Sequence, residues 1–237
     1  MTLTTNQKKI ISSILPGRYL QYLYALNQPK AIKIDALKLI YVPVPKAANR
    51  SIKEVLAAKI NLPFEVSAHK AAWNFIPIKS IPKSAYYSFS FVRNPLDRLV
   101  SCFIQKTKMK DVNRNFWKYG KSVPQDISFL DFVDFVCNTP DHLSDPHFKS
   151  QHKFLVIKDQ LAVDFIGKYE QLNEDWKHIS DRFELPDLGH FNQSHRSETK
   201  DYYTKELALK VKNRYQEDIE IFGYQTEVVQ FIESLPN

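Results

Sequence analysis

The sequence has few of the features that mark secreted, membrane-spanning or metal-binding proteins. Its 237 residues include two cysteines, Cys102 and Cys137, and both lie in apolar helical patterns, so we expect buried free thiols rather than a disulfide. No apolar run is long enough for a membrane span or a signal peptide, which predicts a cytoplasmic protein. Repeats, low-complexity segments and the Walker string Gly-x-x-x-x-Gly-Lys-[Ser/Thr] are absent as well.

Histidines spaced five residues apart, His142, His147 and His152, raise the question of a metal site. No cysteine accompanies them, and the prolines in this part of the chain predict a loop rather than one helical face of ligands. We therefore expect no metal.

The composition is that of one folded domain with a basic surface. Hydrophobic residues make up 43% of the chain and no linker divides it, so we expect a single domain over residues 1–237, with a helical extension over residues 1–30. The formal net charge of +7 favours polyanionic ligands. Nucleic acid is not an expected partner, because the lysines are scattered and no nucleic-acid-binding motif occurs.

Residues 39–53 combine an apolar strand, a tight turn and a helix. Lys46 lies in the turn, Ala47 and Ala48 keep that turn narrow, and we expect the helix to open at Ser51 as its cap. Backbone N–H groups at a helix start converge on an anion, the helix dipole adds partial positive charge, and Lys46 adds a full charge. The pattern predicts a phosphate or sulfate site, although a buried strand followed by an ordinary amphipathic helix would produce it too.

A second strand-to-helix unit follows at residues 86–103. Aromatic and β-branched residues predict a strand up to Val92, and Asn94 and Pro95 are typical of the cap and first position of a helix. Arg93 therefore stands at the carboxyl end of a strand, where ligands collect in open α/β sheets. A charged side chain is costly to bury there without a partner, so we expect an anion as that partner.

Along this second helix, Arg98 and Ser101 lie three residues apart and share a polar face. Either an ion pair or a contact with a ligand is consistent with Arg98.

These two units resemble the carbohydrate sulfotransferase family, in the branch of the chondroitin, dermatan and HNK-1-type enzymes and their bacterial relatives. Residues 45–52 are similar to the family's 5′-phosphosulfate loop, and residues 91–101 are similar to its 3′-phosphate element. The resemblance continues through residues 164–176 and 215–224, and it covers about residues 37–225. It implies a P-loop-like, three-layer α/β/α sandwich with a mostly parallel central sheet.

The resemblance also implies an activity and a set of binding residues. The activity is transfer of a sulfuryl group from 3′-phosphoadenosine 5′-phosphosulfate (PAPS) to a hydroxyl of a carbohydrate or glycoconjugate acceptor. Arg93 and Ser101 would hold the 3′-phosphate, and a later loop would contact PAPS through Ser194 and Arg196. The 5′-phosphosulfate would be held by Lys46, as a catalytic cation, and by the backbone of Ala47, Ala48, Asn49, Arg50, Ser51 and Ile52. Relatives often carry Thr in place of Arg50. The Arg50 side chain either donates a further hydrogen bond to the phosphate or sulfate of PAPS or faces solvent.

In-line sulfuryl transfer needs a base near neutrality for the acceptor hydroxyl, and histidine is the obvious residue. His69 lies between the two anion-binding units, where other carbohydrate sulfotransferases place a base, and is our first choice. His147 is its rival, and with Gln151 it resembles a family stretch that we assign to the acceptor side.

Two other function classes stay open. A nucleotide kinase or other phosphoryl transferase of P-loop architecture would need a carboxylate for Mg²⁺ near a strand end, where this chain has Arg93. A non-catalytic polyanion-binding module would bind sulfated or phosphorylated ligands without turnover.

The remaining pattern predicts these elements: helices over residues 6–27, 51–60, 128–137, 173–183 (capped by Asn173), 203–221 and 226–235; strands over 31–34, 37–42 and 163–166; and a basic loop over 106–125.

Overall fold

The computed structural model of the protein describes residues 29–64, 67–68, 71–108, 126–189 and 199–236. A five-stranded sheet forms its centre, in the order β3-β1-β2-β4-β7. Its strands are β1 (Lys30–Ile34), β2 (Leu39–Val42), β3 (Phe75–Pro77), β4 (Tyr87–Val92) and β7 (Phe165–Lys168). The helix predicted over residues 6–27 lies outside the described residues.

Strand direction places the ends of β2, β4 and β7 at one edge of the sheet. β2 pairs in parallel with β4, and β4 pairs in parallel with β7, while β1 is antiparallel to both β2 and β3. Four of these five strands therefore run in one direction. The register pairs Val42 with Ser90 and Val92 with Lys168, so the segments that leave these three strands emerge together. The predicted α/β class with a mostly parallel sheet is confirmed.

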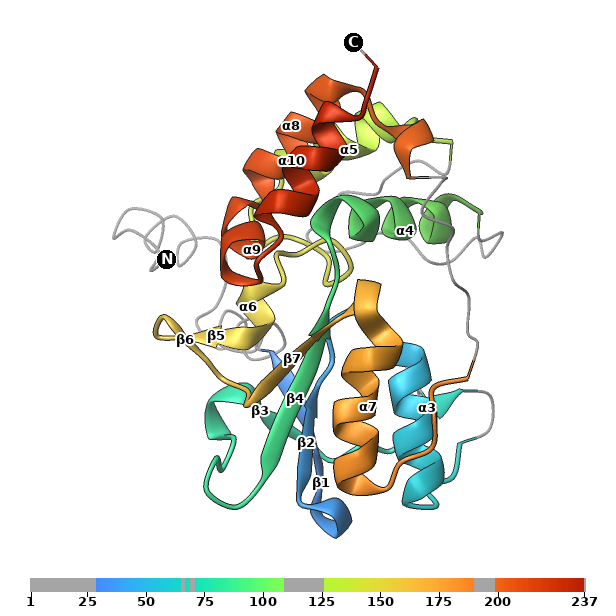
Figure 1. The fold of residues 1–237 in the computed structure, drawn as a ribbon, viewed down its shortest axis with the longest axis vertical. Coiled ribbons are helices and arrows are strands. Elements are labelled where there is room, and N and C mark those ends of the chain that lie inside the picture. Colours follow the sequence, from blue (N-terminus) through green and yellow to red (C-terminus); the bar gives the residue numbers. More distant parts are fainter. Residues whose placement is uncertain (1–28, 65–66, 69–70, 109–125, 190–198, 237) are drawn as a thin grey trace, which may run out of the picture.

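The described helices cover the sheet and its carboxyl edge. α3 (Asn49–Lys59) and α7 (Leu172–Phe183) lie side by side along the sheet, and α4 (Pro95–Lys108) crosses beyond the end of β4 (Figure 1). Past that same end gather α5 (Phe129–Cys137), α8 (Lys205–Arg214), α9 (Gln216–Ile221) and α10 (Gln225–Glu233) (Figure 1). The short α6 (His152–Leu155) leads into a hairpin of β5 (Val156–Ile157) and β6 (Gln160–Leu161).

Aromatic packing fixes the central strands against α7. Every residue of β2 is buried, and the ring of Tyr41 stacks on Phe89 of β4 with centroids 5.0 Å apart. Trp176 of α7 packs against Phe89 and Phe91 at 6.2 and 6.4 Å. Gly167 of β7 leaves room for this cluster, because a Cβ at that position would lie 2.3 Å from the Phe91 ring.

Several boundaries differ from the sequence prediction. Asn173 does not cap α7, which begins one residue earlier without a side-chain cap. The helix predicted over 203–221 is broken at Tyr215, whose backbone leaves helical geometry and whose hydroxyl donates to the carbonyl of Phe148. α4 continues to Lys108, into the predicted loop, and the last strand is shifted to 165–168. β3 and the β5–β6 hairpin were not predicted.

The helix predicted over residues 128–137 and the predicted free cysteines are confirmed. The Ser128 hydroxyl caps α5 by accepting from the N–H of Asp131 at 3.1 Å. Both cysteines are free, Cys102 fully buried and Cys137 half-buried. Across the residues that the structure describes, no helix is both long and apolar enough to cross a membrane.

Candidate active site

The turn between β2 and α3 has an unusual backbone. Lys46 (φ 73°) and Ala48 (φ 54°) both adopt left-handed conformations, which L-residues rarely occupy, and Ala47 between them is buried. Residues held in such conformations cluster at ligand-binding turns, because closely placed positive-φ residues aim main-chain N–H groups at one point. The turn thus has the backbone form of an anion site without containing a glycine.

Two main-chain N–H groups of this turn already donate to carbonyls of the protein. The N–H of Ala47 donates to Val44 at 3.4 Å, and that of Ile52 donates to the Ala48 carbonyl at 3.1 Å as the first bond of α3. The first amides of a helix have no carbonyl partner within it. Of the main-chain N–H groups predicted to bind the 5′-phosphosulfate, those of residues 48–51 therefore remain as candidates. Ser51 is the third residue of α3 and not its cap, since Ala48 occupies that place without a side-chain bond.

Two hydrogen bonds join residues 45 and 46 of this turn to α4. The Nζ of Lys46 donates to Oε1 of Gln105 at 3.0 Å, and Nε of Arg98 donates to the Pro45 carbonyl at 3.0 Å. Ser101 lies three residues after Arg98 and four before Gln105, so all three occupy one face of α4. The predicted 5′-phosphosulfate turn therefore lies against the helix face that carries Ser101.

Arg98 forms no ion pair with any residue that the structure describes, and it is too deeply buried to contact a ligand. Its side chain is 2% exposed and donates to three carbonyls, those of Pro45, Lys149 and Pro146, at 3.0, 2.8 and 3.2 Å. It thereby ties the turn after β2 to the segment that contains His147.

Arg93 is 5% exposed and follows β4 directly. Its guanidinium lies 4.2 Å from the ring centre of Tyr169, which follows β7 at the same sheet edge. The fully buried Gln151 holds its main chain, accepting from the Arg93 N–H at 2.9 Å and donating to the Arg93 carbonyl at 2.8 Å. The buried Asp218 accepts from the N–H of Gln151 at 2.7 Å. Gln151 therefore fixes the main chain of Arg93, and its predicted place on the acceptor side stays a prediction.

Comparison with known proteins agrees with this geometry. A family model described as "Sulfotransferase family" matches residues 30–225. The chain belongs to the sulfotransferase family. It is 25% identical to carbohydrate sulfotransferase 14 of Danio rerio, over 80% of this chain and 60% of that protein. It is 27% identical to carbohydrate sulfotransferase 11 of Mus musculus, over 89% of this chain and 69% of that protein, and 27% identical to carbohydrate sulfotransferase 12 of Xenopus laevis, over 59% and 40%. The chain thus spans 40–69% of the length of these three sulfotransferases.

His147, one of the two predicted bases, is held by a neighbouring carboxylate. Nδ1 of His147 lies 2.6 Å from Oδ1 of Asp145, which also accepts from the His147 N–H at 2.9 Å. The side chain of His147 is 34% exposed. A carboxylate on one imidazole nitrogen fixes the ring and leaves the other nitrogen to take up a proton, the arrangement of a general base. His69, Ser194 and Arg196 lie outside the described residues, and their roles stay predictions.

The two remaining cations at the start of α3 face different surroundings. Arg50 is exposed and pairs with Glu54 one turn later at 2.8 Å. Lys53 is 4% exposed, its Nζ lies 5.8 Å from the Phe75 ring centre, and burial lowers its pKa to about 8. Within the described ranges, no three His, Cys, Asp or Glu side chains are grouped so as to hold a metal.

Sequence reasoning missed three of these residues. Tyr169 could have been found because it follows the strand next to β4, and Gln105 because it lies one turn beyond Ser101. Lys53 interrupts the apolar face formed by Ile52, Val55 and Leu56, and that interruption was its only signal.

Proposed function

We propose that this sulfotransferase takes the sulfuryl group of PAPS and transfers it to a hydroxyl of a carbohydrate or glycoconjugate. One observation carries the proposal: two neighbouring parallel strands deliver their strand-to-helix turns to one sheet edge, and each turn bears a cation, Lys46 or Arg93. A nucleotide with phosphate groups at both ends of its ribose needs two such sites a short distance apart. The three relatives are all carbohydrate sulfotransferases, which supports the acceptor class.

The residues present fit such a donor. The amides of residues 48–51 and the Lys46 ammonium provide hydrogen bonds and positive charge for the 5′-phosphosulfate. Arg93 and Ser101 provide them for the 3′-phosphate, with Tyr169 and Gln151 holding Arg93 in place. The proposed reaction forms a bond from the acceptor oxygen to sulfur and breaks the bond from sulfur to the 5′-phosphate oxygen, where Lys46 would offset the developing charge.

The proton of the acceptor hydroxyl passes to a histidine in this proposal. His69 is the choice that the sequence favours, and the support for His147 is its bond to Asp145 and the link through Arg98 to the Lys46 turn. Single His69→Ala and His147→Ala variants separate the two. The variant that lacks the true base loses about 10²- to 10⁴-fold in kcat, while its binding of PAP, the desulfated product of PAPS, stays intact. The other variant keeps kcat near the wild-type value, and full turnover in both would remove histidine from the mechanism.

A thermal-shift comparison of PAP with ADP and with ATP plus Mg²⁺ tests which class of nucleotide the protein binds. A ligand stabilises only the state that it binds, by about 2.7 kcal/mol at one hundred times its Kd. For a domain of this size, that gain raises the Tm by roughly 5–10 °C. We expect the rise with PAP alone. A comparable rise with ATP and Mg²⁺ would favour phosphoryl transfer, and PAP binding without sulfation of any carbohydrate would favour a binding module.

A further inference from the structure

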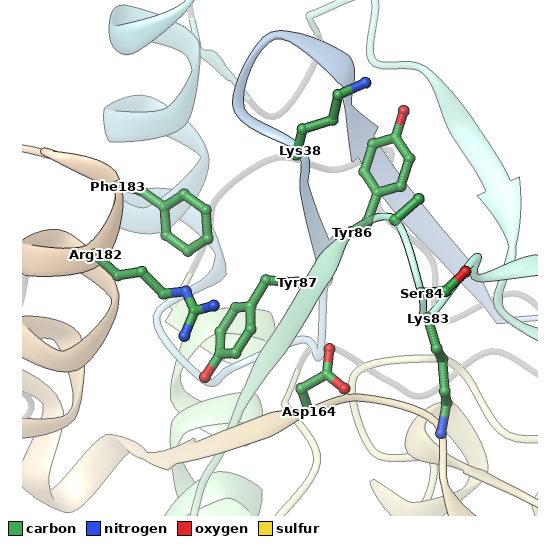
Figure 2. A pocket seen from close by; sticks show the side chains of 9 residues that line it. Lys38, Lys83, Ser84, Tyr86, Tyr87, Asp164, Arg182 and Phe183 are labelled. Carbon is green, nitrogen blue, oxygen red and sulfur yellow. The ribbon is translucent and has the colours of Figure 1, made fainter.

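A pocket lies at the opposite edge of the sheet from the proposed donor site. It has a volume of about 450 Å³ and is formed where β4 begins and α7 ends (Figure 2). β4 is six residues long, so roughly 20 Å separates this pocket from the turn at Arg93. Lys38, Lys83, Arg182, Tyr86, Tyr87 and Asp164 line it, among others.

The charge of the pocket favours an anion. Lys38, Lys83 and Arg182 line it, and none of these three has a carboxylate within 4.0 Å in the part of the chain that the structure describes. The one carboxylate in the lining, Asp164, accepts from the N–H and the hydroxyl of Ser88 at 2.8 and 2.7 Å. The lining thus contains three cations and one carboxylate, and that carboxylate is already hydrogen-bonded.

Tyrosine rings hold two of these cations in place. The Arg182 guanidinium lies 4.1 Å from the ring centre of Tyr87, and the Lys38 ammonium lies 5.2 Å from that of Tyr86. The hydroxyl of Tyr87 is itself anchored 3.0 Å from Nε2 of His178. Figure 2 shows Arg182 beside Tyr87 and Lys38 beside Tyr86, with Asp164 between Tyr87 and Lys83. Positioned cations next to aromatic rings recognise a ligand that has both an anionic group and a ring body.

We propose that this pocket binds a sulfated or carboxylated sugar unit of a long saccharide, at a distance from the site of sulfuryl transfer. The identity of the ligand rests on the proposed function, since a polymeric acceptor could occupy both edges of the sheet at once. The pocket would then anchor an acidic part of the chain while a hydroxyl elsewhere on it reacts.

Titration calorimetry with short dextran sulfate oligosaccharides, neutral dextran and inorganic sulfate tests the proposal. The variant is K38Q with R182Q, two exposed side chains whose loss should leave the fold intact. The control is K177Q with K200Q, which removes the same charge from exposed sites outside the pocket lining. We expect dextran sulfate to bind the wild type and the control, and to bind the K38Q/R182Q variant about tenfold more weakly, at two- to fivefold for each exposed cation.

Three outcomes would overturn the proposal: equal affinity in wild type and variant, an equal loss in the control, or inorganic sulfate binding as tightly as the oligosaccharide. PAP affinity, measured on the same proteins, separates this site from the donor site. A variant that still binds PAP but binds dextran sulfate more weakly supports the proposal that this pocket binds the saccharide. If the wild type binds dextran sulfate but not PAP, and the variant loses dextran sulfate binding, the pocket is supported and the proposed function is refuted.

Discussion

Replacing Lys53 by methionine should stabilise the protein. Lys53 is 4% exposed on α3, and burial lowers its pKa from an ordinary 10.5 to about 8. At pH 7 the side chain is still protonated in the folded state, so the fold carries the cost of a buried charge. Methionine has a similar length and flexibility and fills the same space without that charge.

The size of the effect follows from the pKa difference. The interval between 10.5 and about 8 corresponds to at most about 3–4 kcal/mol, because each pH unit is worth about 1.4 kcal/mol. Partial hydration of the ammonium reduces this, so we expect the Lys53→Met variant to gain about 1–3 kcal/mol at pH 7. Between pH 8 and 10.5 the unfolded chain binds more protons at Lys53 than the folded one, so wild-type stability rises relative to the variant. The advantage of the variant therefore shrinks as the pH rises through this window.

Urea unfolding of wild type and Lys53→Met at pH 7, 8, 9 and 10 measures this difference. Lys177→Met, an exposed lysine on α7, is the matched control and should stay within about 0.5 kcal/mol of wild type at every pH. A Lys53→Met variant that is less stable than wild type at pH 7, by an amount that does not change with pH, would refute the reasoning.

Further predictions concern the residues that shape the site. Ala48→Gly should stabilise the protein by about 0.5–1 kcal/mol in urea unfolding, because glycine relieves the left-handed backbone at φ 54°; a loss of stability would contradict the strain. Arg98→Met should destabilise it by about 3 kcal/mol or more in thermal unfolding, since three carbonyls lose their donor, and a wild-type Tm would show that the buried clamp is dispensable. Gln151→Leu should weaken PAP binding several-fold by releasing the Arg93 main chain, whereas unchanged affinity would remove its positioning role.

The strand-to-helix units could be predicted because their signals are local and agree with one another. β4 ends at Val92, and the side chain of Asn94 accepts from the N–H of Leu96 at 3.0 Å, as a helix cap does. Pro95 then begins α4 as expected. The parallel pairing that brings the two units to one edge follows from the α/β class that the resemblance implied.

The supporting contacts could not be predicted because they end on backbone carbonyls or depend on conformation. Arg98 bonds carbonyls of residues 45, 146 and 149, and a carbonyl looks the same in every residue type. The left-handed backbone at Lys46 and Ala48 has no sequence signal either, since glycine is absent from the turn. Tertiary bonds also overrode propensity at Tyr215, where a continuous helix had been expected.

Calorimetric titration of PAP and AMP, which differ only in the 3′-phosphate, tests most directly whether the two turns form one donor site. Lys46→Ala should weaken both ligands about tenfold or more, because it removes a charged hydrogen bond to the phosphate that they share. Arg93→Ala should weaken PAP to a similar extent and leave AMP unchanged. Wild-type affinity of Arg93→Ala for PAP, or equal binding of PAP and AMP by the wild type, would contradict the account.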